Sequence, residues 1–390
     1  MDAFHVGHGR VCITPPLGIR MSGYAARTQG AEDLHDDLYV NALALSDGRL
    51  TVAILAYDVC GMGTELVGEV KDAVRASTGL PAERVLVNAT HTHAGPAVGA
   101  WHKDHEDRDY RRSIVEAGGR AARAAVDDLM PAGLRAGAAP LDIGCNRRER
   151  MADGQVGLGH NRGGQSLKEL TAWHFPRAGA PDIVLFSAPM HGTTLGQEHR
   201  SLSAEWMGLA RRNVEEARSD VRTIFVQGCG ADQDPYWTKI DGKRGSFDEM
   251  ESHGRAASDA VLQAMESARP LDPLPMQAVV RTLALPGKDD AGAAQELPMH
   301  GLRLGDAVLV TIGAEAFVEF AFYGRSVSTA PATLILGYTD SGSVGYLCTA
   351  KSFEEGGYEP RSTRVGPGGE EVVKQGMREV LAELKALAAR

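Results

Sequence analysis

Two histidines directly follow a short β-branched run, which is typical of a buried strand. The run is Arg84-Val85-Leu86-Val87, and it leads into Asn88-Ala89-Thr90-His91-Thr92-His93-Ala94-Gly95-Pro96. In an extended chain, residues two apart point to the same side, so His91 and His93 can reach one site. Imidazole nitrogens in this arrangement favour Zn²⁺, although two ligands do not complete a site. Two histidines in a polar loop are the alternative.

A third histidine also follows an apolar strand. Pro189-Met190-His191-Gly192 comes after the run expected to form a strand over 182–190, and it strengthens the zinc interpretation. The alternative is a histidine that caps a turn. Glu315 stands at the start of an expected helix over 315–327, where the helix dipole favours a carboxylate. Taken alone, Glu315 is better explained as a simple helix-terminal carboxylate than as a ligand.

Other polar residues near expected strand ends have less specific patterns. Arg147 follows the segment Gly144-Cys145-Asn146 and is either a surface arginine or a clamp for a substrate carbonyl or carboxylate. Tyr346 is expected in a short strand, as a core residue or a hydrogen-bond donor. The Gly-rich loop 228–235 lacks both nucleotide-binding glycine motifs. The chain also has no Gly-x-Ser-x-Gly motif, which argues against an α/β-hydrolase triad.

Composition excludes several classes of protein. The chain has 390 residues and a net charge of −10, which argues against nucleic acid or an anionic membrane as the main partner. The N-terminus does not resemble a signal peptide, and no apolar run is long enough to span a membrane. Five scattered cysteines fit reduced thiols, so we expect a cytoplasmic protein. A homo-oligomer is compatible with the sequence, which does not determine the oligomeric state.

The elements that must position these residues alternate between strands and helices. Asp47-Gly48 predicts a hairpin between strands 39–45 and 50–57, and Gly79-Leu80-Pro81 ends a helix that begins near Gly63. Residues 148–165 are polar and Gly-rich, which is typical of a loop. No repeat, linker or shift in composition marks a boundary. We therefore predict one α/β domain over residues 1–390, with a mixed β-sheet core and flanking helices.

Several motifs together resemble the catalytic domain of the neutral, non-lysosomal ceramidases. The His91–His93 segment is similar to the family's Thr-His-Thr-His-Ser-Gly-Pro motif. Further similar segments follow in the family's order along nearly the whole chain. They are Met21-Ser22-Gly23-Tyr24, Asn146-Arg147, His191-Gly192-Thr193, Gly313-Ala314-Glu315-Ala316-Phe317, and Tyr346 with Gly357-Tyr358-Glu359.

This resemblance implies a set of site residues. The implied Zn²⁺ ligands are His91, His191, Glu315 and Tyr346. The implied substrate-binding groups are His93, Arg147, Tyr358 and the backbone of Gly23, and the implied catalytic residues are His93, Arg147, Asp234 and Tyr358. The chain also ends near where the family's catalytic domain ends, so we expect no C-terminal β-sandwich domain.

Asp234 departs from the family pattern. The family's Gly-Asp-Val-Ser-Pro loop carries the proposed serine nucleophile, whereas this chain has Ala231-Asp232-Gln233-Asp234-Pro235. Asp234 could act as a general base, contact a cationic substrate group, or have a structural role in which its carboxylate caps nearby backbone N–H groups ahead of Pro235. Of these three roles, we favour the general base.

These observations predict a zinc-dependent hydrolase that cleaves an amide or ester bond of a small, soluble substrate by zinc-activated water. We do not expect a true ceramidase. One alternative is a zinc-dependent lyase, isomerase or cyclase that uses the same polarised carbonyl. Another is a non-catalytic zinc-binding protein, although a structural zinc would not need His93, Arg147 and Tyr358. No nucleic acid and no membrane insertion are expected.

Overall fold

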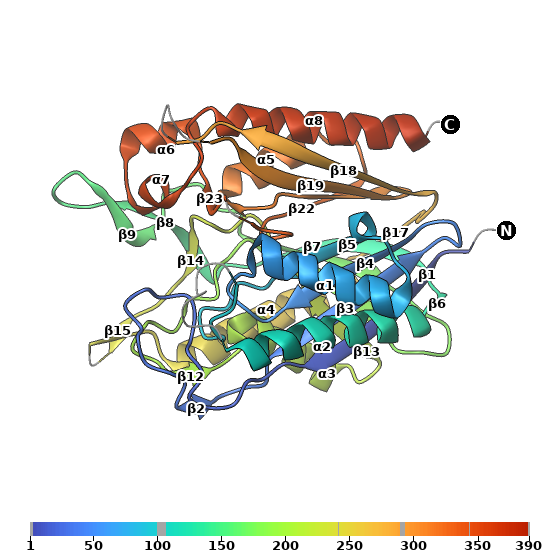
Figure 1. Cartoon of the computed structure of the whole chain (residues 1–390), viewed down its shortest axis with the longest axis horizontal. Helices are drawn as coiled ribbons and strands as arrows, with labels where there is room; N and C mark the ends of the chain where they lie inside the picture. The colour runs from blue at the N-terminus through green and yellow to red at the C-terminus, as the bar shows by residue number, and fades with distance from the viewer. Residues whose placement is uncertain (1–2, 100–106, 241, 289–292, 343, 389–390) are drawn as a thin grey trace.

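A computed structural model shows three large β-sheets, of four or five strands each, whose outer faces carry the long helices (Figure 1). The structure describes residues 3–99, 107–240, 242–288, 293–342 and 344–388. The first and second sheets lie together on one side of the molecule. The third sheet, built from later residues, lies along the other side beneath the C-terminal helix.

The first sheet contains the predicted hairpin. Its strands, in order across the sheet, are β5 (Val85–Ala89), β4 (Thr51–Tyr57), β3 (Tyr39–Ser46), β1 (His5–Cys12) and β6 (Met130–Pro131). Helices α1 (Gly63–Thr78) and α2 (Arg108–Asp127) pack on its outer face. As predicted, α1 ends at a glycine: Gly79 has φ 80° and its N–H bonds to the carbonyl of Arg75. Strand β1 was not predicted, because its alternation is interrupted by glycine and histidine.

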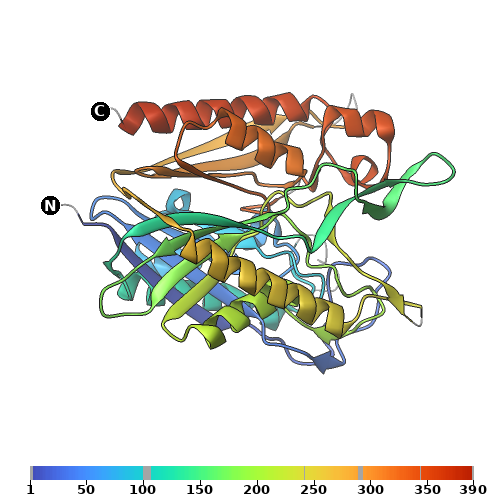
Figure 2. The ribbon, with the colours of Figure 1, turned by 180° about the vertical axis from the view of Figure 1, so that it is seen from behind.

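The second sheet mixes parallel and antiparallel neighbours. Its order is β13 (Val221–Phe225), β11 (Asp182–Ser187), β10 (Glu169–Phe175), β7 (Leu134–Pro140) and β17 (Arg269–Leu271). Helices α3 (Glu205–Ala217) and α4 (Phe247–Glu266) pack against it, and α4 crosses the strands when the molecule is seen from behind (Figure 2). The pair β11–β13 is parallel, so the loops after these two strands emerge at the same edge.

The third sheet is formed late in the chain. Its order is β18 (Met276–Leu285), β19 (Gln295–Leu304), β20 (Ala307–Thr311) and β22 (Ala332–Leu336). Helices α5 (Val318–Val327) and α8 (Gly369–Ala388) cover it, and α8 buries Val373, Met377, Val380 and Leu384. Those four side chains have helical spacing, so one face of α8 packs on the sheet. The pair β20–β22 is parallel.

Short elements connect the sheets around the strand ends. They are β8 (Gly144–Arg150), β9 (Val156–Asn161), β14 (Gln233–Pro235), β21 (Glu315–Ala316), β23 (Tyr346–Leu347), α6 (Ala350–Glu355) and α7 (Tyr358–Ser362). Residues 148–165 were predicted to form a loop, which was wrong, because β8 continues to Arg150 and pairs with β9. Small and polar residues hide the alternation of that hairpin.

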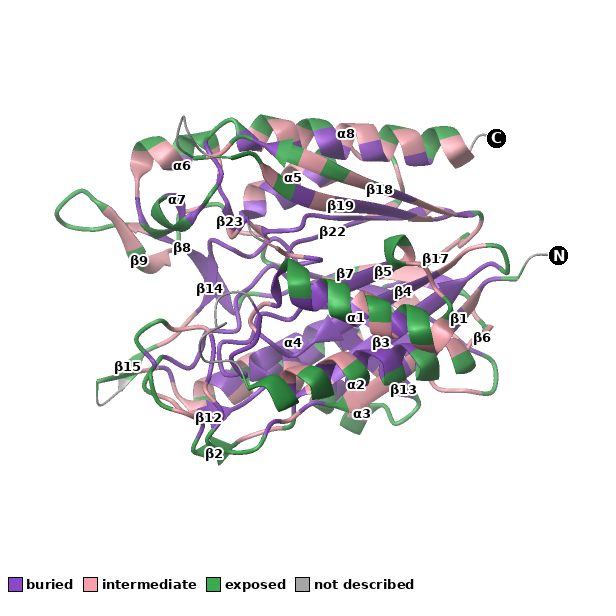
Figure 3. Ribbon diagram, viewed as in Figure 1, coloured by how far each residue is buried: buried purple, intermediate pink, exposed green. Residues whose placement is uncertain are grey.

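The core between the sheets explains the near-continuous apolar runs. In β4, Val52, Ile54 and Ala56 face the layer shared with the other sheets, whereas Ala53, Leu55 and Tyr57 face the helices. Both faces are therefore buried (Figure 3). The predicted fold class, an α/β fold with a mixed sheet and flanking helices, is confirmed. Within the described part of the chain, no helix is long and apolar enough to cross a membrane.

Candidate active site

The candidate site lies where strands from all three sheets end. Each sheet has a parallel pair (β4–β5, β11–β13 and β20–β22), whose carboxyl ends point to the centre of the molecule. Isolated bridges join the loops beyond them: Thr92 pairs with Gly192, Asn88 with Thr339 and Gly228 with Leu336. The loops that carry the three histidines are therefore fixed to one another by backbone hydrogen bonds, and they are buried (Figure 3).

His91 is held in an uncommon backbone conformation. Its φ is 66°, in the left-handed region that a non-glycine residue rarely adopts, and its N–H bonds to the carbonyl of Val59. Its Nδ1 lies 2.5 Å from the carbonyl oxygen of Cys60, which leaves Nε2 for another partner. That Nε2 lies 3.4 Å from Oε2 of Glu315. The ring also packs on Tyr338, with the centroids 4.3 Å apart.

His191 is oriented in the same way. Its Nδ1 lies 2.7 Å from the carbonyl oxygen of Gly230, and its Nε2 lies 3.9 Å from Oε2 of Glu315. Burial, together with Arg147 and His91, holds the pKa of His191 well below its usual range. The ring is therefore neutral, with its lone pair on Nε2, which is the form that binds a metal.

Glu315 and Tyr346 lie side by side on two short parallel strands. They are register partners in the β21–β23 pair, and the N–H of Glu315 bonds to the carbonyl of Gly345. The prediction that Glu315 begins a helix was wrong, because α5 begins only at Val318. Oε2 of Glu315 is buried and has no hydrogen-bond partner among the described residues. A buried carboxylate oxygen left in this way points to a ligand that the protein chain does not supply.

The donor atoms fit a zinc ion. Nitrogen atoms of His91 and His191 and a carboxylate oxygen of Glu315 all lie within 4.8 Å of one another, and the two imidazoles are turned by backbone carbonyls. Tyr346 is the register partner of Glu315 and so lies beside this group. A second group of potential ligands overlaps the first and consists of Cys60, His91 and His93.

Arg147 connects the candidate ligands to buried carboxylates. It lies inside β8 rather than after the strand, and its side chain is 5% exposed. Its Nη1 lies 3.2 Å from Nε2 of His191, and its Nη2 donates to the hydroxyl of Tyr346 at 3.2 Å. Its Nε donates to Glu359 at 2.8 Å. The guanidinium is therefore fixed at the edge of the candidate metal site.

Asp234 accepts hydrogen bonds on both carboxylate oxygens. Oδ1 accepts from Arg147 at 3.3 Å and from the hydroxyl of Thr193 at 3.2 Å, while Oδ2 accepts from Arg244 at 2.9 Å. Burial alone would raise the pKa of Asp234, but Arg244, Arg147 and His191 hold it well below its usual range. The carboxylate is thus charged, buried and engaged on both sides.

His93 lies between His91 and the loop that carries Gly23. Its Nε2 lies 3.1 Å from Nε2 of His91, and its ring meets that of Tyr24 edge-on, with the centroids 5.1 Å apart. Burial and the neighbouring His91 hold the pKa of His93 well below its usual range. Gly23 has φ 95°, and a Cβ there would lie 2.6 Å from Cβ of His93. Only glycine allows the two segments to approach so closely.

These residues surround a cavity of about 410 Å³. His91, His93, Glu315, Tyr346, Tyr358 and Gly23 all line it. Tyr358 is 44% exposed and its ring meets that of Tyr346 edge-on, with the centroids 5.6 Å apart. The structure therefore brings together one ligand-type cluster, a tyrosine pair and the Gly23 backbone around one space. That volume is at the lower end for small-molecule pockets.

Four further residues of the site were not predicted. Cys60 and Tyr338 contact the ring of His91, Glu359 holds Arg147, and Arg244 holds Asp234. Glu359 follows Tyr358 in a segment that the resemblance already marked, so that motif offered a signal. Nothing in the sequence marks Arg244, which reaches Asp234 from a short turn ten residues later.

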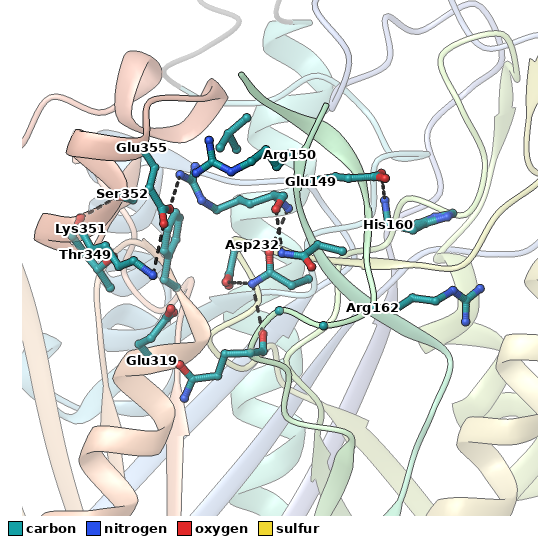
Figure 4. Close-up of a pocket in the computed structure, with 18 residues that line it drawn as sticks. Glu149, Arg150, His160, Arg162, Asp232, Glu319, Thr349, Lys351, Ser352 and Glu355 are labelled. Carbon is teal, nitrogen blue, oxygen red and sulfur yellow. Dashed lines mark hydrogen bonds and ion pairs between the residues drawn. The ribbon is translucent and has the colours of Figure 1, made fainter. Parts of the chain in front are cut away.

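A second cavity, of about 550 Å³, lies between β8–β9 and the C-terminal helices (Figure 4). Asp232 and Glu319 lie at its base, and Glu149, His160 and Arg162 approach from the β8–β9 side. Burial and Glu319 raise the pKa of Asp232 to about 8. None of the residues predicted from the sequence for the site lines this cavity.

Comparison with known proteins identifies the family. The family model described as neutral/alkaline non-lysosomal ceramidase, N-terminal, matches residues 4–231. The chain belongs to the neutral ceramidase family. Ceramidases hydrolyse an amide bond, so the chain belongs to a family of amide hydrolases.

Solved structures of the same family have the same fold. Neutral ceramidase from Pseudomonas aeruginosa superposes with a TM-score of 0.83 at 16% sequence identity, over 99% of this chain and 75% of that one. A structure titled ceramidase complexed with C2 gives the same score and identity, over 99% of this chain and 76% of that one. Because the identity is so low, this likeness concerns the fold.

Proposed function

We propose that this protein is a zinc-dependent hydrolase that cleaves an amide or ester bond of a small, soluble substrate. His91, His191, Glu315 and Tyr346 would hold the zinc. When bound, zinc would polarise a substrate carbonyl and lower the pKa of a coordinated water from about 15.7 towards 7. The cytoplasmic location, the single domain over residues 1–390 and a substrate other than ceramide belong to the same proposal.

The observation that carries the proposal is the position of the ligand-type cluster at the wall of a cavity. A structural zinc is closed off from solvent, whereas a catalytic zinc keeps a coordination position open to water or substrate, here in addition to the protein ligands. Here His91 and Glu315 line a space of about 410 Å³. The size of that space supports a small substrate rather than a two-chain lipid.

The remaining residues have roles in binding and charge stabilisation. Arg147 and Tyr358 would stabilise the negative charge that develops on the carbonyl oxygen, or bind a substrate carboxylate. Arg147 is suited to this because Glu359 fixes its orientation, which removes the cost of ordering it during the reaction. His93 is neutral and would orient the substrate by a hydrogen bond, with the Gly23 backbone on the same side.

For Asp234 we now propose a positioning role in place of the general base. A base with so low a pKa removes a proton poorly, and both carboxylate oxygens already accept hydrogen bonds. Its contacts with the side chains of Arg147, Thr193 and Arg244 support this role, which differs from the capping of backbone N–H groups predicted from the sequence. Contact with a substrate amine would need one of these arginines to move.

Two measurements test the proposed function. Metal analysis of the purified protein should find about one zinc per chain. Incubation with small N-acyl amides or esters in ¹⁸O-labelled water should place the label in the carboxylic acid product. Turnover without incorporation of the label would favour a lyase, isomerase or cyclase. Full zinc occupancy without any turnover of these compounds would favour the non-catalytic alternative.

A further inference from the structure

The charged residues that line the 410 Å³ cavity differ in whether they have partners. Apart from the histidines, the charged side chains among its described lining residues are Arg20, Arg27 and Glu315. Glu315 belongs to the candidate metal site. The two arginines come from one segment, only seven residues apart, and they are in very different environments.

Arg27 donates four hydrogen bonds to backbone carbonyls. Its Nη1 donates to the carbonyl of His93 at 2.8 Å and to that of Ser22 at 3.0 Å. Its Nε and Nη2 donate to the carbonyls of Gln197 and Gly196 at 3.3 Å each. The residue is 5% exposed. Arg27 therefore mainly supports the wall of the cavity, because backbone carbonyls accept from four of its five N–H groups.

Arg20 has a fixed backbone and a free side chain. Its carbonyl accepts from the N–H of Ala97 at 2.7 Å, and it forms a bridge with Gly30, while the next residue bridges Pro96. The segment is thus held on both sides. Arg20 is half-buried, yet its guanidinium makes no hydrogen bond or ion pair with any residue in the part of the chain that the structure describes.

The charge balance of the cavity favours an anion. Glu315 is the one carboxylate among the described lining residues, and a bound zinc would outweigh its charge. Arg147 is already balanced by Glu359 and Asp234. Arg20 is the remaining charge, and a half-buried guanidinium has planar donors that match a carboxylate.

We propose that Arg20 binds a carboxylate on the substrate, at a distance from the bond that is cleaved. The inference rests on the proposed function and narrows it to amides or esters that carry a second, anionic group. An uncharged lipid amide offers this guanidinium only neutral acceptors, which bind it less strongly than a carboxylate. Arg20 would then determine specificity, while the candidate metal site and Arg147 would act on the scissile carbonyl.

Product-like ligands test this without turnover. Succinate, glutarate and adipate each carry two carboxylates, whereas their monoamides carry one, which can still bind zinc. Calorimetry on the zinc-loaded protein should show that at least one diacid binds about ten- to hundredfold more tightly than its monoamide. In Arg20→Gln this difference should disappear, while affinity for the monoamide and zinc content stay unchanged. Arg75→Gln, on the outer face of α1, is the matched control and should keep the difference.

Kinetics should show the same preference for a free carboxylate. N-succinyl and N-glutaryl anilides should have a higher kcat/KM than the corresponding compounds whose terminal carboxylate is an amide. If the diacid preference survives in Arg20→Gln, or if the wild type shows none, the inference is wrong. If the preference exists and depends on Arg20 but no anilide, ester or amide is hydrolysed, the proposed hydrolysis is wrong and the carboxylate site stands.

Discussion

The two cavities of this molecule differ in how their basic side chains are paired. In the 550 Å³ cavity, Arg148 and Lys351 lie 3.4 Å and 3.2 Å from the carboxylate of Glu355, although Oε2 of Glu319 has no described hydrogen-bond partner. In the 410 Å³ cavity, Glu315 Oε2 has no described hydrogen-bond partner, and neither does the Arg20 guanidinium. The larger and more charged cavity is therefore the less promising active site.

The carboxylates of the two cavities show the same difference. Asp232 and Glu319 lie close together in a buried place, and the pKa of each is raised, so one proton removes part of the repulsion. Glu315 instead lies 3.4 Å and 3.9 Å from the Nε2 atoms of His91 and His191. A buried carboxylate is thus stabilised by protonation in one cavity, and in the other it is available to a metal ion. Three experiments can break or sharpen this comparison.

The largest effect is expected from loss of a ligand. His191→Ala should lose zinc and lower hydrolysis to background, because the remaining donors no longer complete a site. The loss of zinc affinity should exceed the about 10- to 100-fold that follows removal of a group supporting a ligand. His174→Ala is the matched control, since this half-buried histidine of β10 pairs with Asp182 instead. A metal-replete His191→Ala that retains a full equivalent of zinc would remove this residue from the ligand set.

A smaller effect is expected at Asp234. If it holds Arg147 and Arg244 in place, Asp234→Asn should lower kcat by no more than about tenfold, since an amide oxygen can still accept from Arg147. Asp234→Ala should cost more, because it leaves both guanidinium groups without that partner. A general base predicts losses of about 10²–10⁴-fold in both variants. Zinc content should stay unchanged in each, and a rise in KM alone would indicate contact with a substrate amine.

The smallest effect is expected on the stability of the protein, through Asp232 in the 550 Å³ cavity. The pKa of Asp232 rises on folding from 3.8 to about 8, so the folded state holds a proton that the unfolded state releases. The contribution of this group to stability is then fully present below pH 4 and is lost as the pH rises towards 8. Urea unfolding across this range should show a steeper decline for the wild type than for Asp232→Asn, by up to about 1.4 kcal/mol per pH unit.

The control for that measurement is Asp259→Asn, on the exposed side of α4, which should keep the slope of the wild type. Equal slopes in Asp232→Asn and the wild type would show that Asp232 is ionised in the folded protein. The two cavities would then not differ in how they stabilise a buried carboxylate.

Much of the fold could be predicted from local pattern. The hairpin of β3 and β4 follows from Asp47-Gly48 between apolar runs, and α1 ends at Gly79 because only glycine readily adopts its φ of 80°. The β8–β9 hairpin could not be predicted, because Arg, Asn and Gly residues replace the apolar alternation. Its stability comes instead from contacts with distant segments, such as the ion pair between Arg148 and Glu359.

For the site, the sequence by itself determined which histidines follow strands, since a β-branched run before His91 and an apolar run before His191 mark strand ends locally. The motif resemblance added Glu315 and Tyr346. Only the tertiary structure decided that Glu315 lies in a strand beside Tyr346 and not in a helix, because that pairing joins residues 31 positions apart. It also decided that the Arg27 side chain donates to four carbonyls, while the Arg20 guanidinium has no partner among the described residues. Partners of a charged side chain come from remote segments, and no local pattern encodes which segments those are.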